Sequence, residues 1–214
     1  MKTKADYSLY LVAVPQYCAG RPVEDVVSAA VDGGVTLVQL RDKECTTREY
    51  VDLALRLKAL LRPHGLPLIV NDRVDVALAV DAEGVHLGQA DMPPALARDL
   101  MGPEAIIGLS VDSHEQAMEA ETLDVDYMGV GPVYSTSTKA DTAPEWGPEG
   151  LETFRPESRH VLVGIGGIDA ENAADVMRAG ADGVAVVSAI CGADDPRRAA
   201  SELRRAVEAG RRRR

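Results

Sequence analysis

The sequence predicts an α/β protein that folds as a single-domain (β/α)8 TIM barrel. Eight short segments rich in Val, Ile and Leu alternate with helical patterns along the chain. Strands that are apolar on both faces and separated by helices are typical of a parallel sheet. Eight such units favour a closed barrel over an open sheet, and 214 residues with 46% apolar side chains suffice for one core. We therefore expect one domain over residues 1–214.

The expected strands share a short length and side chains that are apolar on both faces. They cover residues 9–14, 37–41, 68–70, 84–87, 106–110, 127–130, 161–165 and 183–187.

The expected helices share apolar positions at helical spacing and Pro, Gly, Ser, Thr or Asp at their ends. They cover residues 23–30, 46–62, 74–80, 113–120, 170–179 and 196–209, and a further helix has Pro93 and Pro94 in its first turn. The clearest start signal is the capping-box spacing of Thr46 and Glu49. Residues 131–150 are rich in Ser, Thr, Pro and Gly, which predicts a long loop. Loops of that length in a compact domain are usually functional or disordered.

The composition excludes several classes of function. A net charge of -11 and only one Phe and one Trp disfavour nucleic-acid binding, which needs a basic surface or aromatic stacking. Cys18, Cys45 and Cys191 are scattered, so we expect neither disulfides nor zinc but a reducing, cytoplasmic environment. No apolar run has membrane-spanning length, and no signal peptide is recognisable. Residues 211–214 are expected to be a disordered tail, and homo-oligomerisation is left open.

Polar side chains follow nearly every expected strand. In a (β/α)8 barrel the carboxyl ends of the strands meet at one rim, where catalytic groups gather. These polar positions are Gln39, Arg41, Lys43, Asn71, Asp72, Asp91, Ser110, Thr136, Ser137, Thr138, Lys139 and Ser188. Their convergence on one rim predicts a functional site there.

Gln39, Arg41 and Lys43 alternate along one strand end and therefore share one face. Two cations and an amide on one face predict an anionic ligand such as a phosphate. The alternative is a solvated strand end that continues into a charged loop.

Asp72 and Asp91 on neighbouring strand ends suit a hard divalent cation such as Mg2+. Alternatively, each could cap the helix that follows it. His86 lies inside a strand and is expected to be a packed, hydrogen-bonded core histidine.

A second anion site is expected at the last two strands. Gly166 and Gly167 follow one strand and Ser188 follows the next, which matches the backbone phosphate site common in this barrel. The segment from Gly164 to Asp169 lacks the third glycine of a dinucleotide fingerprint.

Five segments together resemble the thiamine phosphate synthase family, in order and over nearly the whole chain. They are Gln39–Lys43, Asn71–Asp75, Gly84–Asp91, Gly131–Lys139 and Ile165–Ile168. The resemblance implies a transferase of thiamine biosynthesis. It would join hydroxymethylpyrimidine diphosphate to a thiazole phosphate, or to its carboxylated form, and release thiamine phosphate and pyrophosphate with Mg2+ as cofactor.

The resemblance also implies a role for each site residue. The pyrimidine diphosphate would be held by Gln39, Arg41, Lys43, Asn71, Ser110 and Lys139, of which Arg41, Lys43, Ser110 and Lys139 would be catalytic. The thiazole phosphate would be held by Thr136, Ser137, Thr138, Gly167, Val187 and Ser188. The metal ligands would be Asp72 and Asp91.

In this family the carbon–oxygen bond of the pyrimidine is thought to break before the thiazole nitrogen adds, which requires no general base. The segment 131–150, which carries Lys139, would then be a lid over the diphosphate. A thiazole tautomerase of the same fold is an alternative, but it would not need the full metal and diphosphate set. A non-catalytic phosphate-binding module is another, because the fold alone does not fix the function.

Overall fold

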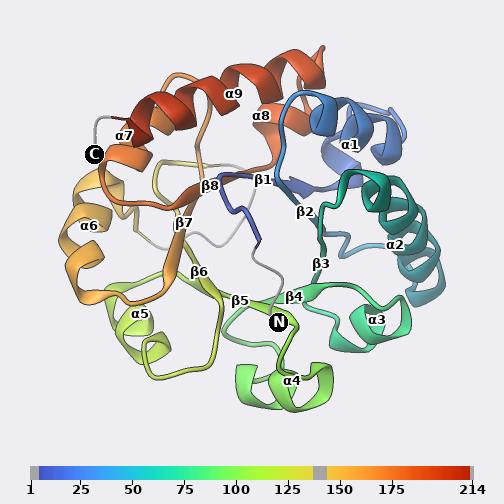
Figure 1. The fold of residues 1–214 in the computed structure, drawn as a ribbon, viewed down its shortest axis with the longest axis horizontal. Helices are drawn as coiled ribbons and strands as arrows, with labels where there is room; N and C mark the ends of the chain where they lie inside the picture. Colours follow the sequence, from blue (N-terminus) through green and yellow to red (C-terminus); the bar gives the residue numbers. More distant parts are fainter. Residues whose placement is uncertain (1–4, 137–143, 213–214) are drawn as a thin grey trace.

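Eight parallel strands form a closed barrel in the order β1 to β8, with β8 paired to β1. The computed structural model describes residues 5–136 and 144–212. Figure 1 shows the strands in the centre and the helices in a ring around them. The predicted (β/α)8 fold is confirmed. No helix in the described ranges is long and apolar enough to cross a membrane.

All eight strands lie on the segments that the sequence predicts, and their ends differ by one residue at most. They are β1 (Leu9–Ala13), β2 (Leu37–Leu40), β3 (Leu68–Asn71), β4 (Gly84–Leu87), β5 (Ile106–Val111), β6 (Tyr127–Val130), β7 (Val161–Ile165) and β8 (Gly183–Val186).

The helices follow the strands in alternation. They are α1 (Val23–Asp32), α2 (Thr47–Leu61), α3 (Val74–Ala79), α4 (Pro94–Met101), α5 (His114–Ala120), α6 (Gly147–Phe154), α7 (Ala173–Arg178), α8 (Ser188–Cys191) and α9 (Pro196–Arg211). Short 3-10 turns are η1 (Pro15–Tyr17), η2 (Arg62–His64) and η3 (Arg155–Glu157).

The capping box of α2 is present as the sequence predicts. The Thr46 hydroxyl accepts from the Glu49 amide, and the Glu49 carboxylate accepts from the Thr46 amide at 2.8 Å. At the other end of the chain, α9 packs against α7 and α1. It thus closes the ring of helices beside β8 and β1, the last and first strands of the barrel (Figure 1).

The predicted loop over residues 131–150 is wrong at its end, because α6 begins at Gly147. Gly147 and Pro148 suggest a turn, yet proline is tolerated in the first turn of a helix. The amide of Gly147 donates to the Val133 carbonyl at 3.0 Å, which ties the helix start to the end of β6. Leu151 and Phe154 are buried beneath the helix.

Three further boundaries differ from the prediction. The helix expected from residue 170 begins at Ala173, because Asp169 accepts from the next amides and forms a turn instead. The short helix α8 follows β8 directly. The expected tail is wrong at its first residue, since Arg211 belongs to α9 and donates to the Asp182 carbonyl at 2.6 Å.

The core has two layers. One lies between the sheet and the helices, and the other fills the barrel interior. The interior layer consists of Tyr10, Val12, Val14, Leu37, Ile69, Ile106, Tyr127, Val163 and Ala185. The cavity lies at the carboxyl ends of the strands, and Tyr10 and Tyr127 of the interior layer form part of its lining.

Candidate active site

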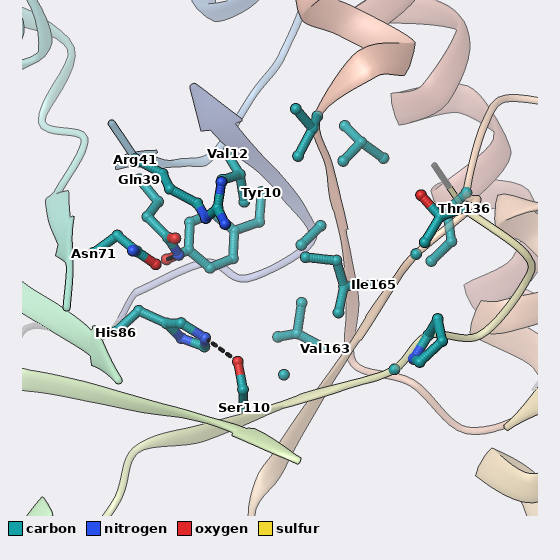
Figure 2. A pocket seen from close by; sticks show the side chains of 18 of the residues that line it. Tyr10, Val12, Gln39, Arg41, Asn71, His86, Ser110, Thr136, Val163 and Ile165 are labelled. Carbon is teal, nitrogen blue, oxygen red and sulfur yellow. Dashed lines mark hydrogen bonds between the residues drawn. The ribbon is translucent and has the colours of Figure 1, made fainter. Parts of the chain in front are cut away.

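One cavity of about 470 Å³ gathers the predicted site residues of the described chain. Its size suits a small-molecule ligand. Those that line it are Gln39, Arg41, Lys43, Asn71, Asp72, Asp91, Ser110, Thr136, Gly167, Val187 and Ser188. Ser137, Thr138 and Lys139 lie outside the described residues. Figure 2 shows Gln39, Arg41 and Asn71 on one side of this cavity and Thr136 on the other.

The cationic side of the cavity is built on the end of β2. Gln39 is buried, and the Arg41 amide continues the ladder by donating to the Ala13 carbonyl at 2.9 Å. The alternation of the strand then directs Gln39, Arg41 and Lys43 to the cavity, as predicted from their spacing. No carboxylate in residues 5–136 or 144–212 forms an ion pair with Arg41. The wall therefore offers positive charge to an anionic ligand.

Neither Asp72 nor Asp91 caps a helix, so that alternative is wrong. The N-caps of α3 and α4 are Arg73 and Pro93, and neither makes a side-chain capping bond. Asp72 has a φ of 61°, a left-handed conformation that is uncommon outside glycine and costs about 1–2 kcal/mol. Its amide donates to the His86 carbonyl at 2.8 Å, which holds this strained position in place.

The side chains of Asp72 and Asp91 lie close enough for Asp72 to affect the pKa of Asp91. Burial, and secondarily the neighbouring Asp72 carboxylate, raises the pKa of Asp91. The Gly88 amide opposes this by donating to Asp91 Oδ2 at 2.7 Å, and Lys43 Nζ lies 3.0 Å from Asp72 Oδ2. A carboxylate whose ionisation is disfavoured by burial and by a neighbouring carboxylate gains from a nearby divalent cation.

The donor set at this position fits Mg2+ that arrives with a phosphate. Mg2+ is usually held by one or two protein carboxylates, with substrate phosphate oxygens and waters as its other ligands. No group of three or more His, Cys, Asp or Glu side chains in the described part of the chain could hold a metal. Asp72 and Asp91 match the number of protein carboxylates that Mg2+ usually takes beside a phosphate.

The far side of the cavity is built from backbone. Gly166 and Gly167 have φ values of 99° and 63°, and a Cβ on Gly167 would lie 2.5 Å from the Ser135 carbonyl oxygen. The side-chain nitrogen Nδ2 of Asn172 donates to the Gly167 carbonyl at 2.9 Å and fixes this turn. Ser188 starts α8 at the same wall. Exposed backbone N–H groups in tight glycine turns are suited to phosphate oxygens.

A buried chain of hydrogen bonds crosses the barrel along the wall of the cavity, and the sequence did not reveal it. Gln39 Nε2 donates to the Tyr10 hydroxyl at 2.8 Å, which lies 2.8 Å from the Tyr127 hydroxyl. His86 Nδ1 lies 2.9 Å from the Tyr127 hydroxyl. On its other side, His86 Nε2 lies 2.8 Å from Ser110 Oγ (Figure 2). His86 is buried and hydrogen-bonded, as predicted, but it also lines the cavity.

Tyr10 and Tyr127 are the main functional candidates missed in the sequence. Burial raises the pKa of both phenols, so both remain protonated and able to donate. The sequence did contain a signal, because two of the strands carry a tyrosine that faces the barrel interior. A buried tyrosine hydroxyl needs a hydrogen-bond partner, so such residues point to a polar contact inside the barrel. Gln89, Asp112 and Asp169 also line the cavity and were not predicted.

Comparison with known proteins gives one consistent result. The family profile described as thiamine monophosphate synthase matches residues 9–190. The chain is 55% identical to the thiamine-phosphate synthase of Albidiferax ferrireducens, with 94% of this chain and 92% of the relative covered. It is 50% identical to that of Syntrophomonas wolfei, with 95% and 98% covered. A solved thiamine phosphate pyrophosphorylase from Pyrococcus furiosus is 41% identical, with a TM-score of 0.88 and coverage of 97% and 98%.

Proposed function

Since the chain belongs to the thiamine monophosphate synthase family and is therefore a transferase, we propose that it couples two heterocycles in the cavity described above. The first is 4-amino-2-methyl-5-hydroxymethylpyrimidine diphosphate. The second is 4-methyl-5-(2-phosphoethyl)thiazole or its carboxylated form. The products are thiamine phosphate and pyrophosphate. One observation carries the proposal: a single cavity has a cationic wall with paired carboxylates on one side and a glycine turn on the other.

The cationic wall suits the pyrimidine diphosphate. Arg41 and Lys43 supply positive charge, and Gln39, Asn71 and Ser110 supply the polar contacts for the ring. Because the whole chain carries a net charge of -11, a local concentration of cations is needed to attract an anion against the overall field. Lys139 is proposed to join this group on the basis of the resemblance alone.

Asp72 and Asp91 would hold the Mg2+ that accompanies the diphosphate. When bound, the metal supplies charge neutralisation for the departing pyrophosphate. The left-handed backbone of Asp72 and the raised pKa of Asp91 support this assignment. Both features are unfavourable for the folded protein, and such features are typical of functional sites.

The glycine turn at Gly167 and the start of α8 at Ser188 would bind the thiazole phosphate through backbone N–H groups. Thr136 and Val187 line the same wall. Ser137 and Thr138 are proposed for this site from the resemblance. Anchoring the phosphate there leaves the thiazole ring directed across the cavity towards the pyrimidine, which is the geometry that a bond between the rings requires.

In the proposed reaction the bond between the pyrimidine methylene carbon and the diphosphate oxygen breaks first. Its electron pair leaves with pyrophosphate, and Arg41 and Lys43 stabilise the charge that develops on the oxygens. The thiazole nitrogen then donates its lone pair to the methylene cation. No proton is transferred, so no general base is needed. Apolar side chains such as Val12, Val163 and Ile165 line the cavity and limit access of water to the cation (Figure 2).

The test is turnover by the purified chain. With both substrates and Mg2+, we expect thiamine phosphate and pyrophosphate in equal amounts, and no product with excess chelator. Isomerisation of the carboxylated thiazole without coupling would instead identify a thiazole tautomerase. Binding of both substrates without any turnover would identify a phosphate-binding module. A cytoplasmic location, homo-oligomerisation and a lid function for residues 131–150 stay predictions.

A further inference from the structure

Gln39 and Ser110 are connected by hydrogen bonds through the interior of the barrel. The connection passes through Tyr10, Tyr127 and His86, and the five residues come from five different strands. All five residues line the cavity, and the two tyrosines are almost completely buried at its base. A continuous polar chain in an apolar barrel is unusual, because buried polar groups are tolerated only when they are satisfied.

The neighbouring glycines show that the barrel is built to hold this chain. A Cβ on Gly108 would lie 2.1 Å from Tyr127 Cζ, so any larger residue would displace the tyrosine ring. A Cβ on Gly129 would lie 3.2 Å from His86 Cε1, which is also tight. Two strand positions thus lack side chains where the ring of Tyr127 and the imidazole of His86 need the space.

We assign the chain a direction by requiring that every buried hydrogen in it has an acceptor. Gln39 donates its amide hydrogen to the Tyr10 oxygen, so the Tyr10 hydrogen is directed to the Tyr127 oxygen. The Tyr127 hydrogen is then directed to His86 Nδ1, which accepts it. The imidazole proton is therefore on Nε2, where it is donated to Ser110 Oγ.

This direction decides what the two ends offer to a ligand. Gln39, with its nitrogen turned to Tyr10, offers its carbonyl oxygen Oε1, an acceptor. Ser110, whose oxygen accepts from His86, keeps its hydroxyl hydrogen for another partner and so offers a donor. Reversing the chain would exchange both: Gln39 would offer its amide nitrogen, and Ser110 would donate to His86.

The geometry points to Tyr10 and Tyr127 as positioning residues that make the cavity select a pyrimidine with an amino substituent over one with an oxo substituent. The inference rests on the proposed function, because it concerns the ring of the proposed pyrimidine substrate. An amino group on the ring can donate to Gln39 Oε1. A carbonyl oxygen at the same place cannot, because it and Oε1 are both acceptors. A site built to pair with a donor rejects an analogue that lacks it, because its own buried acceptor is left unpaired.

Replacing Tyr127 by Phe should remove the hydroxyl that connects the Gln39 end of the chain to the Ser110 end. Tyr10 then loses the acceptor for its hydrogen, and it regains one when the Gln39 amide turns to present Oε1 towards it. The amide nitrogen of Gln39 would then face the cavity, where it matches an oxo group. Phe keeps the ring that fills the space above Gly108, so the packing is conserved.

The test compares dissociation constants for the 4-amino and 4-oxo pyrimidine diphosphates, measured by calorimetry with Mg2+ but without thiazole phosphate, so that no coupling occurs. We expect the preference for the amino form to fall about 10²-fold in Tyr127→Phe. Tyr7→Phe is the matched control. The Tyr7 ring packs on that of Tyr127 at 5.0 Å, but its hydroxyl is not part of the chain and it does not line the cavity. The control should keep the wild-type preference.

An unchanged preference in Tyr127→Phe overturns the inference, while failure of the wild-type chain to form thiamine phosphate overturns the proposed function instead. If Tyr127→Phe does not fold, nitrogen NMR of the wild-type imidazole decides. His86 can be observed alone after His64→Gln, His114→Gln and His160→Gln, the other three of the four histidines. A proton on Nε2 is expected, and a proton on Nδ1 overturns the inference.

Discussion

Lys43 Nζ lies 3.0 Å from Asp72 Oδ2, so the lysine proposed to bind the diphosphate forms an ion pair with a proposed metal ligand. The pair explains how an acidic chain keeps both charges at one rim. A diphosphate with Mg2+ offers each partner a new one: oxygens for the ammonium and a cation for the carboxylate. The ion pair therefore joins two groups that both face the proposed ligands.

The exposure of Lys43 leads to the first prediction. Its side chain is 58% exposed, and exposed ion pairs contribute about 0–1 kcal/mol to stability. Lys43→Ala should therefore lower turnover about 10²-fold through lost stabilisation of the leaving group, with little change in melting temperature. Steady-state kinetics and thermal unfolding on the same preparation check both parts.

Arg56→Ala is the matched control, since Arg56 is 56% exposed and pairs with Glu24 at 2.6 Å on the outer helices. It should change stability as little as Lys43→Ala and leave turnover unaltered. Equal effects of the two variants on turnover would remove Lys43 from the site.

The carboxylate pair leads to a pH prediction. Asp91 has a raised pKa, so its contribution to stability is present at low pH and is lost as the pH rises through that raised value. With chelator present, the wild-type chain should therefore lose stability relative to Asp91→Asn as the pH rises. Adding Mg2+ and pyrophosphate should make the wild type the more stable of the two, because only the wild type keeps both carboxylates. Thermal unfolding across a pH series measures this.

Asp75→Asn supplies a control of opposite sign. The hydrogen bond from Arg73 lowers the pKa of Asp75, so its contribution is present above the ordinary pKa and is lost as the pH falls. This variant should lose stability at neutral pH and approach the wild type in acid. The same pH trend in both variants would show that the Asp91 effect does not come from the carboxylate pair.

The glycine turn gives a prediction with a close structural match. Gly167 and Gly65 have φ values of 63° and 65°, but a Cβ has open space at Gly65 and would clash with the Ser135 carbonyl at Gly167. Alanine at either position should cost about 1–2 kcal/mol through the left-handed backbone alone. Only Gly167→Ala should also raise the KM for thiazole phosphate, on the order of tenfold, because the glycine turn that would bind the phosphate must move. A comparable rise in Gly65→Ala would contradict this assignment.

The strands and the rim were predictable because both depend on local pattern. Short apolar runs mark buried parallel strands, and the period of two places Gln39, Arg41 and Lys43 on one face. The fold then brings distant strand ends such as Asp72 and Asp91 together without any further information. Their capping alternative could be rejected only from the backbone, since the φ of Asp72 is not written in the residue type.

The interior hydrogen-bond chain was not predictable from such patterns. Tyr10 and Tyr127 are 117 residues apart and meet across the barrel, so their contact depends on the stagger of the strands. The start of α6 was missed for another reason: Gly147 and Pro148 are turn residues that also begin helices.

The most direct test of the central claim is a crystal structure with Mn2+ in place of Mg2+, pyrophosphate and thiazole phosphate. The account predicts anomalous density for the metal against Asp72 and Asp91, pyrophosphate on Arg41 and Lys43, and the thiazole phosphate at the Gly167 turn. A metal bound away from both aspartates, or pyrophosphate bound at the glycine turn, would contradict it.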